Sequence, residues 1–290
     1  MESARAVARE ATDAVPKYQE TWVKRIDVEL AVGDMESART IARDATEAAP
    51  KNQNTWMKRI DVELAVGDME SARAIARDAT EVAPKHQDTW MKRIDVELAV
   101  GDMESARAVA REATDAVPKY HATWLKRINV ELAVGDMASA RAIAKDATDA
   151  LSADKNVWSK RMNIEWDMAN DEQLRDLIEQ AVKNVPNYLT LRQYQLAFER
   201  KVGNLEQVRL LKRSLIVQFA RQEDKLHESI EYHLEAGRFL IAKEIYRLLF
   251  QILPSRSNDW HQLSVIEEQL GNHKRAARFR RIGDLCDDIE

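Results

Sequence analysis

The sequence contains little of what builds disulfide-rich, membrane-spanning or loop-rich proteins. Its 290 residues include 1 cysteine, 8 glycines and 6 prolines, and aromatic residues make up 6%. The single cysteine, Cys286, cannot form an internal disulfide or a cysteine-rich zinc site, so a reducing compartment is expected. No apolar run approaches the roughly 18 residues that a membrane helix requires, and the N-terminus lacks the features of a signal peptide. We therefore expect a soluble, intracellular protein without a membrane partner.

The composition also excludes disorder. Hydrophobic residues make up 45% and charged residues 32%, and 44 basic residues nearly balance 49 acidic ones to give a net charge of -5. A disordered chain has a lower apolar content and a larger net charge. High charge with few glycines, prolines and aromatics is typical of an all-helical protein.

Punctuating residues recur at a fixed interval of 34 residues. The tryptophans of this lattice are Trp22, Trp56, Trp90, Trp124, Trp158 and, after slots occupied by Arg192 and Leu226, Trp260. The prolines share the interval at Pro16, Pro50, Pro84, Pro118, Pro186 and Pro254, and seven of the eight glycines do so from Gly33 onward. Such self-similarity is the signature of a repeat architecture.

Each unit reads as two helices. Apolar residues at helical spacing predict a first helix over 21–32, which we name the A type; Gly33 ends it, and Asp34 suits the N-cap of the next helix. The second helix, the B type, ends before Pro50. Its apolar stripe consists mostly of small residues: Ala38, Ile41, Ala42, Ala45 and Ala49.

A hairpin of this kind cannot bury its apolar face alone, so successive units must stack. We predict an all-α fold: a right-handed superhelical α-solenoid of antiparallel helix hairpins with about 17 helices. The chain starts with a B-type helix that has no A-type partner before it. Residues 1–151 are nearly identical repeats and residues 152–290 are diversified ones, which we expect to be continuous with the first part.

The repeat resembles the HAT (half-a-TPR) motif and, in much of its pattern, the tetratricopeptide (TPR) repeat. Trp22, Gly33, Ala38, Ala45 and Pro50 fit both patterns. The HAT pattern is favoured by the glutamate seven residues after the tryptophan. The C-terminal half is similar to the HAT units of a pre-mRNA splicing factor that bridges small nuclear ribonucleoproteins in the tri-snRNP. The resemblance implies a non-catalytic protein scaffold in nuclear RNA processing.

No motif for catalysis, metal binding or a cofactor is present, so we predict no enzyme activity, no metal site and no cofactor. The recurring glutamate is instead interpreted as structural, together with the tryptophans. It needs a cationic partner if it is buried, and the candidates are Arg25 on the same helix and Arg39 on the B-type helix. The positions are Glu29, Glu63, Glu97, Glu131, Glu165, Glu199 and Glu267.

A partner surface is expected on the A-type helices, at the first and fifth residues after each tryptophan. One row is apolar and the other mainly acidic, which would suit an extended or helical peptide with apolar and basic side chains. The alternative is that both rows only pack neighbouring helices. The proposed residues are Met57, Met91, Leu125, Asp27, Asp61, Asp95, Asn129 and Asn163.

Two further surfaces leave alternatives open. Lys-Arg pairs such as Lys24-Arg25 recur in every early unit and would suit a nucleic-acid backbone, but nearby aspartates favour a salt-bridged face over direct RNA binding. The uncovered N-terminal B-type helix indicates either a fragment of a longer array or a self-associating face.

The function predicted from the sequence is a non-enzymatic scaffold for protein partners in a ribonucleoprotein assembly, with pre-mRNA splicing favoured. The resemblance implies a nuclear location; without it, the cytoplasm is expected. The alternatives are a TPR-like adaptor outside RNA biology and direct RNA binding through the Lys-Arg pairs.

Overall fold

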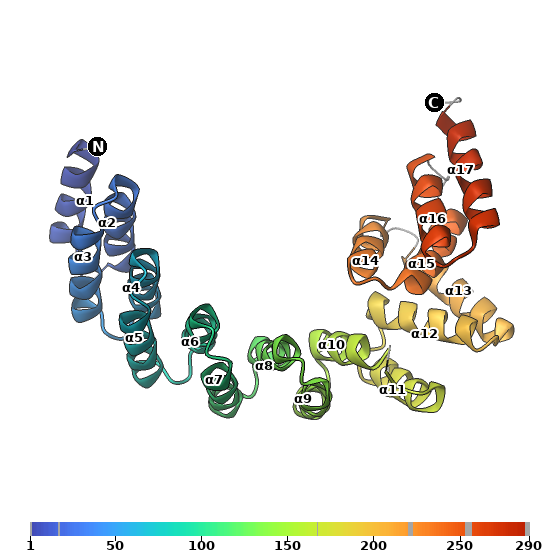
Figure 1. Ribbon diagram of the computed structural model, residues 1–290, viewed down its shortest axis with the longest axis horizontal. Coiled ribbons are helices and arrows are strands. Elements are labelled where there is room, and N and C mark those ends of the chain that lie inside the picture. Colours follow the sequence, from blue (N-terminus) through green and yellow to red (C-terminus); the bar gives the residue numbers. More distant parts are fainter. Residues whose placement is uncertain (1, 17, 167, 220–222, 253–256, 288–290) are drawn as a thin grey trace. The chain divides into compact units, whose positions relative to one another are not determined.

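The computed structural model describes all residues except 1, 17, 167, 220–222, 253–256 and 288–290. The described residues form seventeen helices and no strand, which confirms the predicted all-α repeat fold (Figure 1). The odd-numbered helices are of the B type: α1 (Glu2–Ala14), α3 (Met35–Ala48), α5 (Met69–Val82), α7 (Met103–Ala116), α9 (Met137–Ala150), α11 (Asp171–Asn184), α13 (Leu205–Phe219), α15 (Phe239–Ile252) and α17 (His273–Asp287). The even-numbered helices are of the A type: α2 (Gln19–Val32), α4 (Gln53–Val66), α6 (Gln87–Val100), α8 (His121–Val134), α10 (Lys155–Glu165), α12 (Leu189–Lys201), α14 (Glu223–Glu235) and α16 (Ser257–Gln269).

The chain divides into two compact units, unit 1 over Met1–Arg161 and unit 2 over Met162–Glu290. The packing boundary therefore falls inside α10, close to the sequence boundary at 151/152 but not at it. Arg161 of α10 donates a 2.7 Å hydrogen bond to Thr148 of α9 within unit 1. Two residues later, Asn163 has its hydrogen-bond partners in unit 2.

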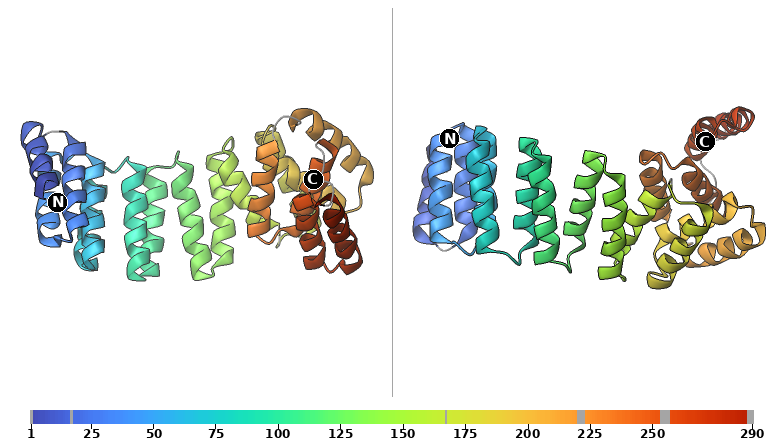
Figure 2. Two further views of the ribbon diagram at one scale, coloured as in Figure 1. Left: turned by 90° about the horizontal axis from the view of Figure 1, so that it is seen from above. Right: turned by 60° about the horizontal axis from the view of Figure 1, so that its bottom comes forward.

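Within unit 1 the hairpins lie side by side with roughly parallel helix axes (Figure 2). The A-type helices form one layer and the B-type helices the other, and the row of hairpins bends toward the A-type side (Figure 1). The right-handed sense of the superhelix stays a prediction.

The turn inside each hairpin of unit 1 works as the sequence predicts. Gly33 follows α2 with φ +82°, and its backbone conformation is one that a residue with a Cβ rarely adopts. Asp34 then caps α3, because its carboxylate accepts a 3.1 Å hydrogen bond from the Ser37 backbone N–H. The same cap recurs before α5, α7 and α9.

The core of unit 1 repeats with the sequence. Trp22 and Ile26 of α2 pack on the small residues of α3 and against Val62 of α4, so each A-type helix fills the groove between the next B-type and A-type helices. The lattice tryptophan is buried in every hairpin of unit 1, and its indole N–H donates to a backbone carbonyl six residues earlier, such as that of Pro16 at 2.7 Å. The tryptophans of unit 1 thus lie in the core of their hairpins.

Unit 2 packs its helices less regularly. The hairpins α14–α15 and α16–α17 are present, but α12 also packs against α15, and so does α13. Trp260 is only half-buried and stacks on Phe250 with 4.3 Å between ring centroids. The residue six positions before Trp260, equivalent to the Pro16 that accepts from Trp22, is Pro254, which lies outside the described residues.

Candidate protein-binding surface

The A-type helices of unit 1 present a groove between α2 and α4. It brings Val23, Met57 and Asp61 together, along with Gln19, Glu20, Lys24, Asn54 and Lys58. Met57 and the equivalent residues Met91 and Leu125 are half-buried, as are Asp27 and Asp61, while Asp95 and Asn129 are exposed. The residues proposed for the surface in unit 1 are therefore all at least partly accessible.

The aspartates of this surface are not free carboxylates. Each aspartate pairs with a lysine of the following A-type helix: Asp27 with Lys58, Asp61 with Lys92, and Asp95 with Lys126. These lysines directly follow Met57, Met91 and Leu125 in the sequence. The lysine side chains are 20–21% exposed, and the aspartates 43–50%. An approaching partner consequently meets the carboxylates more than the ammonium groups.

The arginines that follow these lysines are engaged in a second way. The Arg93 guanidinium lies 5.6 Å from the centre of the Trp90 ring and donates a 3.1 Å hydrogen bond to the Thr80 hydroxyl. Arg59 and Arg127 make the same contacts in their own hairpins, and burial lowers the pKa of both guanidinium groups. In the pairs Lys58-Arg59, Lys92-Arg93 and Lys126-Arg127, both residues thus have structural partners within unit 1, as the salt-bridged interpretation requires.

The recurring glutamates of unit 1 are buried and paired, but with a different arginine from the two expected. Glu29 accepts a 2.8 Å hydrogen bond from Arg5 on the preceding B-type helix, and not from Arg25 or Arg39. Arg39 serves the next repeat, where it lies 2.6 Å from Glu63. The pattern is offset by one unit because each B-type helix packs against the following A-type helix as well as its own.

The same arginine also binds the helix-capping aspartate. Arg73 lies 2.7 Å from Glu97 and 2.8 Å from Asp102, so one guanidinium bridges two carboxylates. The carboxylates, Glu97 first, raise the pKa of Arg73. Hydrogen bonds from Ser105, first from its backbone N–H, and then from Arg73 lower the pKa of Asp102. Equivalent clusters join the repeats at Arg5, Arg39 and Arg107.

Two glutamates of unit 2, Glu199 and Glu267, are also buried, but their partners differ from those in unit 1. Glu199 accepts from Arg175 at 3.2 Å and from the Asn204 side chain at 2.8 Å. Glu267 is fully buried and accepts from Lys243 at 2.9 Å and from Asn272 at 2.8 Å. Asparagine thus takes the place of the capping aspartate. The sequence shows this replacement, but only the structure shows that the asparagine side chain donates a hydrogen bond to the buried glutamate.

Asn163 belongs to unit 2 and has neighbours that the sequence did not indicate. Its side chain accepts a hydrogen bond from the Tyr194 hydroxyl and donates one to Tyr232, and its backbone carbonyl accepts from Arg238 at 3.1 Å. His233 packs edge-on against both tyrosine rings, and burial lowers its pKa to about 3. This cluster joins α10, α12 and α14 and is a packing element of unit 2.

Among the residues that the structure describes, no three or more His, Cys, Asp or Glu side chains are grouped as metal ligands. In the same part of the chain, no helix has the length and apolarity needed to cross a membrane.

Comparison with known proteins identifies the repeat type for the central part of the chain. Residues 57–121 and 92–155, together about a third of the chain, match the family model of the tetratricopeptide repeat. No curated protein sequence matches the chain. The matched model describes a repeat and not an enzyme class, and the resemblance to HAT repeats stays a prediction.

Two solved structures with a similar course of helices are TPR proteins. One, from Parabacteroides merdae, is 13% identical with a TM-score of 0.45, over 81% of this chain and 93% of its own. The other, a thermophilic protein from Thermus thermophilus, is 19% identical with a TM-score of 0.37, over 61% of this chain and 97% of its own. Residues 57–155 are thus similar to tetratricopeptide repeats, within a chain whose described part is built from helical repeats throughout.

Proposed function

We propose that the protein is a non-catalytic scaffold whose A-type helices bind an extended or helical segment of a partner protein. The observation that carries the proposal is the groove between α2 and α4, where half-buried apolar side chains lie beside aspartates that are more exposed than their lysine partners. Methionine side chains adapt to different apolar surfaces, so Met57 and Met91 suit a peptide ligand.

The charge of the surface favours a basic partner. An exposed ion pair contributes little to stability, so an incoming arginine or lysine can share the outer oxygen of Asp61 or Asp95 at small cost. An acidic partner would approach the more exposed carboxylates and be repelled. The preferred ligand therefore combines apolar residues with lysine or arginine.

A narrower proposal follows from the resemblance to HAT repeats: the partner would be a protein of a ribonucleoprotein assembly, with pre-mRNA splicing in the nucleus as the setting. Its support is the sequence resemblance alone. A general adaptor outside RNA biology would use the same surface with other partners.

Selection of a displayed peptide library on the full chain tests the ligand chemistry. We expect selected peptides to be rich in apolar and basic residues. The triple variant Asp27→Asn, Asp61→Asn, Asp95→Asn should bind them about ten-fold more weakly, since three exposed charge contacts are lost. A matched control carries Asp44→Asn, Asp78→Asn and Asp146→Asn, which lie exposed on the B-type helices.

The control should bind as tightly as the unchanged chain. Selection of acidic peptides, or equal binding by both triple variants, would contradict the proposed surface. A labelled single-stranded RNA measured across a salt series gives a separate check, because a basic nucleic-acid groove predicts binding that falls steeply with salt.

A further inference from the structure

Helices α1 and α7 have the same sequence and different environments. Residues 1–18 and 103–120 are identical, from the Met-Glu-Ser start to the tyrosine. In α7, Val109 is 4% exposed and Ala106 and Ala110 are fully buried. In α1, the equivalent Val7 is 64% exposed, and Ala4 is exposed as well. One amino-acid sequence thus provides both the free face and its covered counterpart.

The cover of α7 is the preceding A-type helix. Trp90 and Ile94 of α6, with Leu98 packed beside them, lie on the alanines and Val109 of α7 and reach Val130 of α8. These three residues are four apart and so form one stripe on α6. The occupied groove therefore has two walls, α7 and α8.

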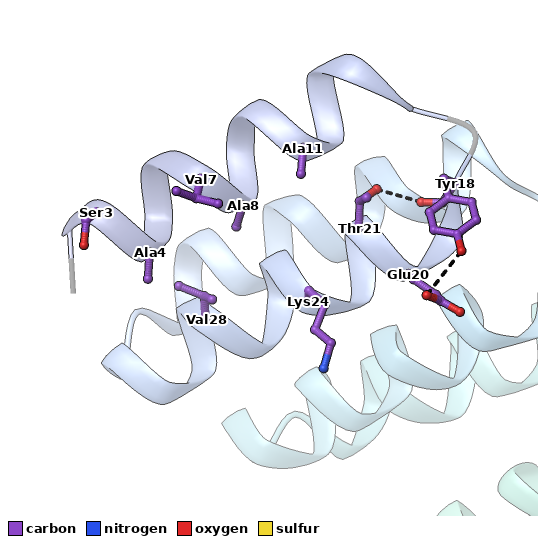
Figure 3. A pocket seen from close by; sticks show the side chains of 10 residues that line it. All are labelled: Ser3, Ala4, Val7, Ala8, Ala11, Tyr18, Glu20, Thr21, Lys24 and Val28. Carbon is purple, nitrogen blue, oxygen red and sulfur yellow. Dashed lines mark hydrogen bonds between the residues drawn. The ribbon is translucent and has the colours of Figure 1, made fainter.

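The equivalent groove between α1 and α2 is open (Figure 3). It encloses about 570 Å³ and is lined by Ala4, Val7, Ala8 and Ala11 from α1, and by Thr21, Lys24 and Val28 from α2 among others. Val28 and Thr21 are half-buried, whereas their counterparts Val130 and Thr123 are buried. Both walls of the groove thus match those that α6 fills.

Charge adds a second point of complementarity. Lys126 of α8 pairs with Asp95 of α6, five residues after Trp90. Lys24 holds the same position on α2, lines the open groove and is exposed. A helix bound here in the manner of α6 would place its aspartate beside Lys24.

We propose that the α1–α2 groove binds a partner helix with the chemistry of α6: a tryptophan, large aliphatic residues four and eight positions later, and an aspartate at the fifth. The established packing of α6 on α7 and α8 supplies the template. A second copy of α1 fits less well, because its face offers only Val7 and alanines where the groove in the interior receives a tryptophan. This site on α1 lies beyond the A-type surface of the proposed function.

A 19-residue peptide tests the proposal directly. It spans Pro84–Asp102 of this chain, so that the Trp90 indole N–H keeps its acceptor at the Pro84 carbonyl, 2.8 Å away, and Gly101 can end the helix. Fluorescence anisotropy of the labelled peptide, titrated with the full chain, should show saturable binding. A Trp90→Ala peptide should bind about ten-fold more weakly or worse.

Two protein variants locate the binding site. Val7→Arg places a charge in the groove and should abolish peptide binding, while Ala6→Arg on the outer face of the same helix should leave it unchanged; Ala6 and its counterpart Ala108 are both exposed. Because Val7 and Ala6 are both exposed, neither change removes a buried contact, and circular dichroism checks that both variants keep their helices.

A charge exchange makes the orientation testable. Lys24→Asp in the protein should weaken binding of the unchanged peptide, and Asp95→Lys in the peptide should restore it. Absence of saturable binding, or equal binding by the Val7→Arg and Ala6→Arg proteins, would overturn the proposal. Sedimentation velocity tests a second copy of the chain as the occupant: an oligomer that Val7→Arg dissociates would assign the groove to that copy and overturn the proposed partner helix. The comparison of Val7→Arg with Ala6→Arg does not depend on the Asp27, Asp61 and Asp95 surface, whereas Lys24 lines both grooves.

Discussion

Buried glutamates at the same position of the repeat have different hydrogen-bond and ion-pair partners in unit 1 and unit 2. In unit 1, Glu97 lies near the capping carboxylate of Asp102, and Arg73 bridges the two. In unit 2, Asn272 replaces that aspartate and donates directly to Glu267, leaving Lys243 to balance one charge. Carboxylates only accept hydrogen bonds, whereas an amide also donates, so in unit 2 the asparagine supplies one of the hydrogen bonds that the glutamate accepts.

The comparison shows that the charged cluster of unit 1 constrains three positions of the repeat together. A guanidinium presents several donors in a fixed plane and can serve two carboxylates at once, which a lysine ammonium does less well. The cluster at Arg73 therefore couples three positions on two repeats, and a change at one disturbs the others. With asparagine in place, the cation can be Arg175 or Lys243, and the residues around it are freer to vary.

The largest expected effect is the loss of stability when the buried glutamate is removed, and it should differ between unit 2 and unit 1. Glu267→Ala leaves the ammonium of Lys243, whose side chain is 7% exposed, without its carboxylate, and should lower the free energy of unfolding by about 3–5 kcal/mol. Glu97→Ala should destabilise the chain less, because Arg73 is 32% exposed and keeps Asp102 as a partner. Urea denaturation followed by circular dichroism measures both. Unchanged stability of Glu97→Ala, or equal losses in the two variants, would refute the distinction.

A smaller effect concerns how the hairpins turn. Gly101 has φ +82° with no atom near the site of a Cβ, so Gly101→Ala should cost about 1 kcal/mol through backbone strain alone. At the equivalent place near the unit boundary stands Ala169, and no described residue other than glycine has a positive φ. Helix α10 there ends early, after 11 residues instead of 14. Ala169→Gly should therefore leave the melting temperature nearly unchanged; a loss as large as that of Gly101→Ala would contradict this explanation.

The smallest effect is the dependence on pH. The folded state lowers the pKa of Asp102 below its ordinary value of 3.8, so its stabilising contribution is complete above that value and is lost as the pH falls through the lowered pKa. Asp102→Asn removes this titration and can donate to Glu97 as Asn272 does to Glu267. As the pH falls from about 4 to about 2, the melting temperature of the unchanged chain should therefore approach or fall below that of the variant, because the lowered pKa of Asp102 lies below its ordinary value.

The control for this titration is Asp78→Asn, which removes an exposed carboxylate outside the cluster. Its melting temperature should follow that of the unchanged chain through the same range. A constant difference between the Asp102→Asn variant and the unchanged chain at every pH would contradict the role given to Asp102.

Much of the fold could be predicted from the spacing of a few residue types. Trp22, Gly33, Asp34 and Pro50 mark a helix core, a helix end, a helix start and a second end, and the structure places each in that role. These signals are local, because they depend on residues within one or two turns of each other. In unit 2 the glycine signal survives, because Gly203, Gly237 and Gly271 keep a positive φ, whereas Trp260 is only half-buried. Where Ala169 replaces the glycine, the preceding helix ends early.

Pairing across repeats was predicted only in part. A buried glutamate must have a cationic partner, so the existence of the pair follows from the sequence, but Arg5 was not identified as the partner of Glu29. The spacing of 24 residues recurs at every cluster and could have indicated it. The lysine partners of the surface aspartates and the hydrogen bonds of Asn163 likewise required the packing of neighbouring A-type helices.

The sequence by itself determined the helices, their order and the apolar stripe along each helix, because these depend on periodicity and on caps within a few residues. Only the tertiary structure decided which charges meet between repeats and which faces remain open. The identical helices α1 and α7 show the physical reason: burial depends on whether a neighbouring helix is present, and 18 shared residues contain no record of that neighbour.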